Sequence, residues 1–242
     1  MIKFFRKIRQ NLLMENKTGK YFKYAIGEIL LVIIGILIAV SINGWNENRK
    51  LKIEEQSILK DLKQEITMNL TALEEAIEAN EKSFQAAVEM RSLFRDREAF
   101  NKMSDSLFFV LSQKLNWNYT YDPKNGILNS IISSGQINQL SDKELKYLLA
   151  SLKELTIDAL ENTMKIEVQR DELMKSSWTN AMIIEDKKIQ GYNVKALYDH
   201  TDFRWATDHL FYFNRKDGLK EEKELKATLE HIIELINKNI IK

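Results

Sequence analysis

The residues between Tyr198 and Phe213 carry the side chains best suited to chemistry. Histidines and aspartates alternate there with aromatic residues: Tyr198, Asp199, His200, Asp202, Phe203, Trp205, Asp208, His209, Phe211, Tyr212 and Phe213. Imidazole and carboxylate groups are the usual protein ligands of Zn²⁺ and related metals. However, His200 and His209 are nine residues apart, which does not place them on one helix face, and the sequence contains no H-x-x-x-H or E-x-x-H spacing. We therefore expect no metal site. The favoured interpretation is an aromatic helix that covers the core. The alternative is a partner- or ligand-binding patch made of Tyr198, Asp199, His200, Trp205 and His209.

No other stretch of the sequence carries a catalytic motif. Ser133, Ser134 and Gly135 stand together, but no strand precedes them and no G-x-S-x-G occurs, so we expect a helix C-cap at Gly135. The sequence has no P-loop, no dinucleotide-binding fingerprint, no zinc-site spacing and no repeat of about 20–50 residues. It therefore predicts no catalytic residue, no cofactor and no metal, and it favours a non-enzymatic protein.

One acid, Glu28, stands beside a long apolar run. An ionisable side chain near the edge of a membrane indicates function by default, although it can also snorkel toward the headgroups and Lys20 or Lys23. Gly35, Ala39 and Ile42 lie within about 40° of Glu28 on a helical wheel. Small residues let helices approach closely in lipid, so this stripe is a candidate intramembrane interaction face, with chance alignment as the alternative.

The apolar run itself predicts one membrane-spanning helix. Every residue from Ile29 to Val40 is apolar or Gly, but these 12 residues extend over only about 18 Å of helix. A bilayer core needs about 20 residues, so the span must extend to residues 24–45. A cleaved signal peptide with a site near Ala39-Val40-Ser41 is the competing interpretation; the helical pattern that continues past Trp45 argues against it.

Residues 1–23 form a basic amphipathic segment with a net charge of +6. The basic residues are Lys3, Arg6, Lys7, Arg9, Lys17, Lys20 and Lys23. Beside a span, this charge predicts contact with anionic lipids and a cytoplasmic N-terminus, so residues 46–242 are expected outside the cytoplasm. The remainder of the chain has a net charge of −5, which argues against a nucleic-acid partner. With no Cys, an exported domain must depend on its core for stability.

Residues 46–242 predict an all-α domain with two long helices. An apolar stripe from Leu59 to Val88 steps by 3, 4 or 7 residues and indicates a helix over residues 46–95, with charged residues such as Glu65 on its other faces. This stripe packs either on later helices of the same chain, which we favour, or on a second chain as a coiled coil. A turn is expected at residues 96–104, then a helix capped by Ser104 or Asp105, a loop over residues 116–126 and a short helix over residues 127–135.

The second long helix is expected to begin with a capping box at Ser141 and to run to Ile184 as the antiparallel partner of residues 46–95. A turn follows, in which Gly191 would permit a positive φ. The last helix is expected over residues 219–241. No stretch alternates convincingly with period 2, so we expect no significant sheet.

Several segments resemble an uncharacterised family of Bacteroidota membrane proteins. They are the basic leader, N-K-T-G-K-Y, Y-A-I-G-E-I, the aliphatic run and S-I-N-x-W-N-E at residues 41–47, with a weaker match at residues 125–135. The resemblance implies a bacterial inner-membrane protein and supplies no activity.

The favoured function is a single-pass, membrane-anchored periplasmic module for interaction, sensing or scaffolding. Its expected partners are membrane lipids and either a second copy or another membrane protein. One alternative is a subunit of an ion-driven inner-membrane complex that uses Glu28. The other is a periplasmic enzyme or small-ligand binder that uses residues 198–213.

Overall fold

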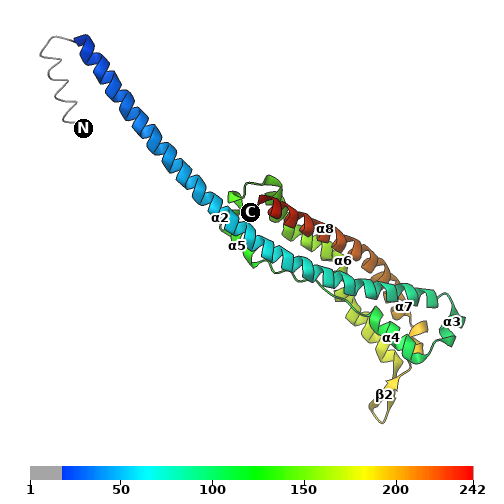
Figure 1. Ribbon diagram of the computed structural model, residues 1–242. Helices are drawn as coiled ribbons and strands as arrows, with labels where there is room; N and C mark the ends of the chain where they lie inside the picture. Colours follow the sequence, from blue (N-terminus) through cyan, green and yellow to red (C-terminus); the bar gives the residue numbers. More distant parts are fainter. Residues whose placement is uncertain (1–17, 242) are drawn as a thin grey trace. The chain divides into compact units, whose positions relative to one another are not determined.

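The computed structural model describes residues 18–241 and divides the chain into two units, residues 1–55 and residues 56–242 (Figure 1). Helices dominate the described residues, and one small hairpin accompanies them. The expectation of a mostly helical fold is therefore confirmed; we expected no significant sheet, and the structure adds this small two-stranded hairpin.

The first unit consists of the N-terminal half of α2 (Thr18–Leu93). The only proline of the chain is Pro123, so nothing in α2 removes a hydrogen bond from the helix interior. The apolar side chains from Ile26 to Val40 are exposed, and this part of α2 is long and apolar enough to cross a membrane. The helix continues without a break across residues 45 and 46, where we placed the end of the span.

The second unit is built on three long helices: α2 from residue 56 onward, α6 (Lys143–Ala181) and α8 (Arg215–Asn239). Their apolar faces form one core, which includes Leu62, Ile66, Leu149, Leu229 and Ile232. Residues 56–93 of α2 thus pack on helices of the same chain, as we favoured.

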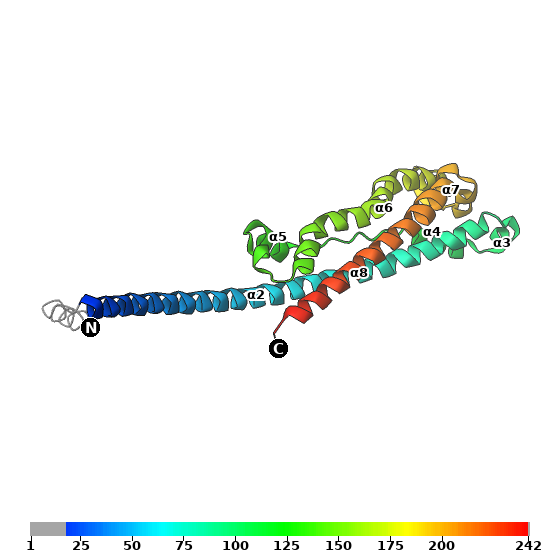
Figure 2. The same cartoon turned by 90° about the horizontal axis from the view of Figure 1, so that it is seen from above.

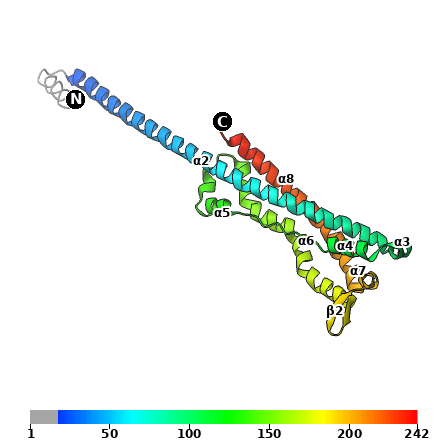
Figure 3. The ribbon, with the colours of Figure 1, turned by 60° about the horizontal axis from the view of Figure 1, so that its bottom comes forward.

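The direction of α6 is the main topological correction. Gln56 of α2 and Asp142, just before α6, both bond Asn239 at the end of α8. Farther along, Asn80 of α2 and Thr163 of α6 both bond Glu222 near the start of α8. Helix α6 therefore runs parallel to α2, and α8 is the antiparallel partner of both (Figures 1 and 3).

A parallel α6 requires a long return from the end of α2, and residues 94–142 provide it. They form α3 (Arg97–Lys102), α4 (Asp105–Leu115), an extended segment over residues 116–125, α5 (Gly126–Ser133) and the 3₁₀ turn η1 (Gln136–Gln139). Figure 2 shows the extended segment running lengthwise between α4 and α5. The expected turn at residues 96–104 was wrong, because Asp96 caps α3 through the Ala99 N–H. The Ser104 cap of α4 is confirmed, and Gly135 has the expected left-handed φ of 76°.

Polar side chains on one face of α2 hold this return segment. Ser83 donates to the Leu115 carbonyl (2.9 Å), and the Asn80 amide both donates to and accepts from the Tyr119 backbone (3.0 Å each). Asn69 makes the same pair of bonds to the backbone of Lys124 (2.9 Å each). Glu65 accepts from the N–H groups of residues 127 and 128 (2.7 and 2.9 Å) and so caps α5. Glu65 is buried, which contradicts its expected position on a solvated face.

A second apolar cluster fills the end of the unit where α2 finishes. It includes Met90, Phe108, Ile166, Phe203 and Phe211, and it unites α2, α4 and α6 with the C-terminal segments. Those segments are the 3₁₀ turn η2 (Val194–Asp199), α7 (Thr201–Asp208) and the π-helical turn η3 (His209–Asn214), which leads directly into α8. The predicted aromatic helix is thus three short elements.

Helix α6 ends at Ala181 and not at Ile184, because a β-hairpin follows it. Strands β1 (Met182–Glu185) and β2 (Lys188–Tyr192) are antiparallel. Asp186 and Lys187 form the two-residue turn and both have positive φ (49° and 62°), as type I′ turns require. Gly191 lies inside β2 opposite Ile183 and does not provide the positive φ that we expected. At the other end of α6, the cap is Asp142 and not Ser141: its carboxylate accepts from the Leu145 N–H (3.1 Å).

Candidate functional site

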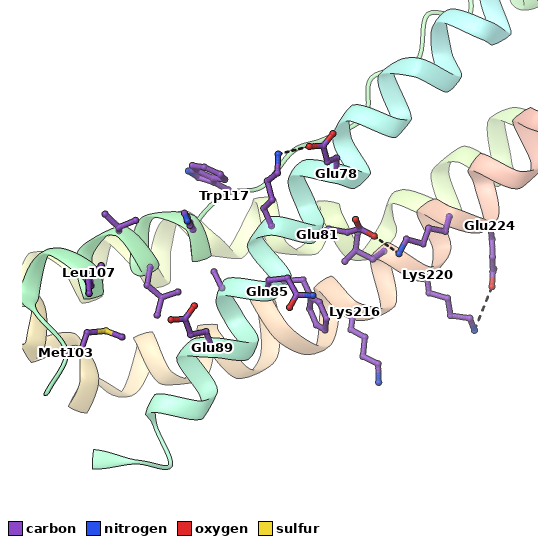
Figure 4. Close-up of a pocket in the computed structure, with 18 of the residues that line it drawn as sticks. Glu78, Glu81, Gln85, Glu89, Met103, Leu107, Trp117, Lys216, Lys220 and Glu224 are labelled. Atoms are coloured by element: carbon purple, nitrogen blue, oxygen red, sulfur yellow. Dashed lines mark hydrogen bonds and ion pairs between the residues drawn. The ribbon is translucent and has the colours of Figure 1, made fainter. Parts of the chain in front are cut away.

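The best candidate for a functional site is a groove between α2, α4 and α8, with a volume of about 1290 Å³ (Figure 4). Its walls are residues 78–89 of α2, residues 216–227 of α8, and α4 with the adjoining Met103 and Trp117. We call it the α2–α4–α8 groove. Its floor is apolar and comprises Phe84, Ala86, Leu111 and Leu219.

The composition of α4 explains why the groove stays apolar. Residues 107–111 are Leu-Phe-Phe-Val-Leu, but a surface helix can turn only one face to the core. Phe108, Leu111 and Leu115 take the buried positions. Leu107 and Val110 lie beside this buried face and line the groove, where they are 61% and 48% exposed. Apolar side chains gathered in a groove of this size indicate a binding surface.

Charged side chains surround the apolar floor. They are Glu78, Glu81, Lys82, Glu89, Lys114, Lys216, Lys220, Lys223 and Glu224. Three ion pairs join most of them: Lys223–Glu81 (2.6 Å), Lys82–Glu78 (2.7 Å) and Lys220–Glu224 (3.8 Å). The hydrogen bond from Lys82 lowers the pKa of Glu78, so this carboxylate stays ionised.

Two rim lysines, Lys114 and Lys216, form no ion pair with any described residue, and both are exposed. One lies on the α4 wall and the other on the α8 wall. Glu89 on the α2 wall is also exposed and forms no ion pair with any described residue, so the groove offers charges of both signs beside an apolar floor. This combination fits an amphipathic segment with charged flanks.

The dimensions of the groove suit a helix. The lining residues of α2 and of α8 each extend over 12 positions, which corresponds to about 17 Å or three helical turns. The lining includes no Ser, Thr, His, Asp or Tyr, so a nucleophile–base pair of the hydrolase type does not occur there.

A buried polar cluster lies between the two apolar clusters and has a structural role. Glu222 accepts from Thr163 Oγ1 (2.6 Å) and from the Asn80 amide (3.3 Å), and burial raises its pKa. The Arg215 guanidinium donates to the Trp117 carbonyl (3.0 Å) and to Asn118 Oδ1 (2.6 Å), and burial lowers its pKa to about 10. These bonds connect α2, α6 and α8 to the return segment.

The predicted patch at residues 198–209 does not form a single surface. Tyr198 is a core residue whose hydroxyl donates to the Leu93 carbonyl (3.2 Å) and whose ring packs on Phe100. Asp199 forms an exposed bidentate pair with Arg97, and the His200 ring bonds the Asn180 amide (2.8 Å). These contacts join residues 198–200 to α2, α3 and α6, so the three side chains serve helix packing.

Trp205 and His209, the other members of the predicted patch, do lie together on the surface. Their rings stack at 4.5 Å with an interplanar angle of 6°, and Phe213 follows one turn later. Within the described residues, no group of three or more His, Asp or Glu side chains is placed to hold a metal ion.

The stripe predicted in the span lies in the first unit. Gly35, Ala39 and Ile42 are exposed there, and Glu28 is half-buried. A Cβ added at Gly35 would meet no atom within 4 Å. Of the predicted membrane-surface lysines and arginines, Lys23 is exposed and Lys20 lies in α2 with its side chain undescribed; the others lie outside the described residues: Lys3, Arg6, Lys7, Arg9 and Lys17.

Within residues 18–241, the fold and the groove define a mostly helical protein with one helix long and apolar enough to cross a membrane and an open groove with an apolar floor. The chain belongs to a family of unknown function (DUF6090), whose sequence pattern matches residues 28–203. The matched region contains the α2 and α4 walls of the groove, whereas the α8 wall lies beyond it. No curated protein and no solved structure matches the chain.

Proposed function

We propose that this chain is a single-pass membrane protein whose helical second unit works as an interaction module outside the cytoplasm. The apolar residues 24–45 anchor it, and the basic residues 1–23 place its N-terminus in the cytoplasm. The observation that carries the interaction role is the α2–α4–α8 groove, which exposes Leu107 and Val110 beside two lysines without ion pairs. The groove is proposed to hold an apolar helix face.

Photo-crosslinking in membranes tests the interaction role. A photoreactive amino acid replaces Val110 in the groove or Gln113, which is exposed on the same helix and does not line the groove. We expect a crosslinked product of defined size from position 110 and none from position 113. Equal yields at both positions, or no product from position 110, would refute the role.

Thiol labelling tests the anchor and its orientation. The chain has no Cys, so the Asn101→Cys variant carries a single exposed thiol in the second unit. A membrane-impermeant maleimide should label it in intact spheroplasts as fully as after permeabilisation. Labelling that requires permeabilisation would place the helical unit on the cytoplasmic side and contradict the orientation.

A further inference from the structure

The buried polar cluster contains a carboxyl group with no cation in contact. Glu222 of α8 is 1% exposed and forms no ion pair with any described residue. Its hydrogen bonds come from neutral groups: Oε1 accepts from Thr163 Oγ1 of α6 (2.6 Å), and both carboxyl oxygens accept from the Asn80 amide of α2 (3.3 and 3.4 Å). Burial of a carboxylate without a cation beside it disfavours the ionised form.

The nearest opposite charge, Arg215, does not reach this carboxyl group. It lies at the start of α8, seven residues before Glu222, which corresponds to about 10 Å along the helix axis. The Arg215 guanidinium is fully buried and donates to the Trp117 carbonyl and to Asn118 Oδ1, while its Nε and Nη1 have no hydrogen-bond partner among the described residues. The two buried charges of α8 are therefore held separately, each by neutral groups.

Burial decides the protonation of Glu222. Desolvation raises its pKa and outweighs the two kinds of hydrogen bond and the attraction of Arg215, which lower it; the neighbouring Glu221 adds to the rise. The contacts from α2 and α6 are an amide and a hydroxyl, which do not titrate. The charged groups of α6 near the cluster, Glu167 and Arg170, act on Arg215. Protonation of Glu222 thus removes a buried charge.

The geometry accommodates this proton without rearrangement. A hydroxyl group is both a donor and an acceptor, so a protonated Glu222 can donate to Thr163 Oγ1 over the same 2.6 Å. The Thr163 hydroxyl proton can then turn to a carbonyl of the preceding helical turn. The second carboxyl oxygen keeps its contact with the Asn80 amide. Both protonation states therefore fit the same packing, and they differ in the cost of the buried charge.

Glu222 is connected to the groove wall through Asn80. The same amide forms two 3.0 Å hydrogen bonds with the Tyr119 backbone, and Trp117, two residues earlier, lines the groove. We propose that Glu222 is a pH-sensitive switch, whose protonated form holds the return segment at Trp117 against α2 and α8 more firmly than its ionised form does. The effect on the groove rests on the proposed function, because the switch regulates the same site.

The second unit should lose stability as Glu222 ionises. Because the pKa of Glu222 is raised, the stability that its protonated form contributes is fully present below the ordinary value of 4.5 and is lost as pH rises through the raised value. Glu222→Gln has a similar shape and stays neutral at every pH. Relative to the unmodified chain, this variant should therefore gain stability as pH rises.

Urea unfolding of the full-length chain in detergent at several values between pH 4 and pH 9 tests the sign. The midpoint of Glu222→Gln should be close to that of the unmodified chain at pH 4 and higher by at least about 0.5 M at pH 9. Thr163→Val removes a donor to the carboxylate, so its loss of stability should grow as pH rises. A difference that is constant with pH for either variant, or a Glu222→Gln midpoint below that of the unmodified chain at pH 9, would overturn the inference.

Hydrogen exchange tests the connection to the return segment. The Tyr119 N–H, which donates to Asn80, should lose protection with rising pH more steeply in the unmodified chain than in Glu222→Gln, after correction for intrinsic exchange rates. Equal slopes would sever Glu222 from the groove wall and overturn the switch. Neither measurement needs a groove partner, so a failed switch leaves the photo-crosslinking result intact. Conversely, no product from position 110 would refute the interaction role while the pH dependence persists.

Discussion

Replacing Asn80 by Ala should destabilise the second unit strongly, although the change removes only three side-chain atoms. The Asn80 amide forms two 3.0 Å hydrogen bonds with the Tyr119 backbone and also donates to Glu222, and the side chain is fully buried. Each hydrogen bond contributes about 1 kcal/mol net, and a buried partner left unsatisfied costs about 1–3 kcal/mol. Glu222 retains its bond to Thr163, which limits the loss. We expect a decrease of about 2–4 kcal/mol in the free energy of unfolding.

Urea unfolding of the full-length chain in detergent, followed by far-ultraviolet circular dichroism, measures this change. With a slope of about 2 kcal/mol per molar urea, the midpoint should fall by about 1–2 M. The control is Asn101→Ala on the exposed surface of α3, which should leave the midpoint unchanged. A midpoint for Asn80→Ala within about 0.2 M of the unmodified chain would refute the role of these bonds.

Three further predictions concern the contacts of α6 and α8. The hydrogen bond from the Leu145 N–H lowers the pKa of Asp142, so the ionised carboxylate stabilises the fold at neutral pH and this stability is lost as pH falls through the lowered pKa. Asp142→Ala should therefore cost about 1 kcal/mol at pH 7, and the difference in urea midpoint between the variant and the unmodified chain should shrink toward pH 3. The hydrogen bond to Glu144 raises the pKa of His231, so the protonated imidazole stabilises the fold at pH 5.5 and this stability is lost as pH rises through the raised pKa. His231→Ala should therefore lower the thermal midpoint more at pH 5.5 than at pH 8.5. A Cβ at Gly218 would lie 3.3 Å from side-chain atoms of α6, so Gly218→Val should cost about 1–3 kcal/mol in urea unfolding, and an unchanged midpoint would contradict this close helix contact.

The helices could be predicted because their signals are local. Ser104 caps α4 and Gly135 follows α5 as expected, since capping depends on the residues within one turn. The hairpin was missed because its turn uses Asp186 and Lys187 in left-handed conformations, where Gly or Asn is usual.

The direction of α6 could not be predicted, because it depends on a segment without regular structure. Residues 116–125 satisfy their backbone groups through Asn69 and Asn80, and side-chain-to-backbone pairs of this kind leave no periodic pattern in the return segment. A signal does exist in α2: Glu65, Asn69, Asn80 and Ser83 fall within about 60° on a helical wheel and mark a polar stripe. Glu65 appeared to be a solvated charge because its partners, two amide groups of α5, are distant in sequence.

The groove was absent from the sequence-based predictions for a different reason. The run Leu107–Leu111 is too apolar for a helix with one buried face, which is a local signal that could have been used. The α2 and α8 walls of the groove could not be predicted from the sequence, because these two helices come together only in the tertiary fold. The residues of the predicted patch are separated for the opposite reason: they are adjacent in sequence, but Tyr198 turns to the core and His209 to the surface.

Thiol protection in membranes tests the central claim, an occupied groove, most directly. Single cysteines replace Leu107 in the groove or Gln113 outside it, and no native thiol competes for the reagent. In native membranes, the thiol at position 107 should react with a small maleimide at least about tenfold more slowly than the thiol at position 113. Dilution into detergent should make the two rates similar. Equal rates in native membranes would show that the groove is empty and would contradict the account.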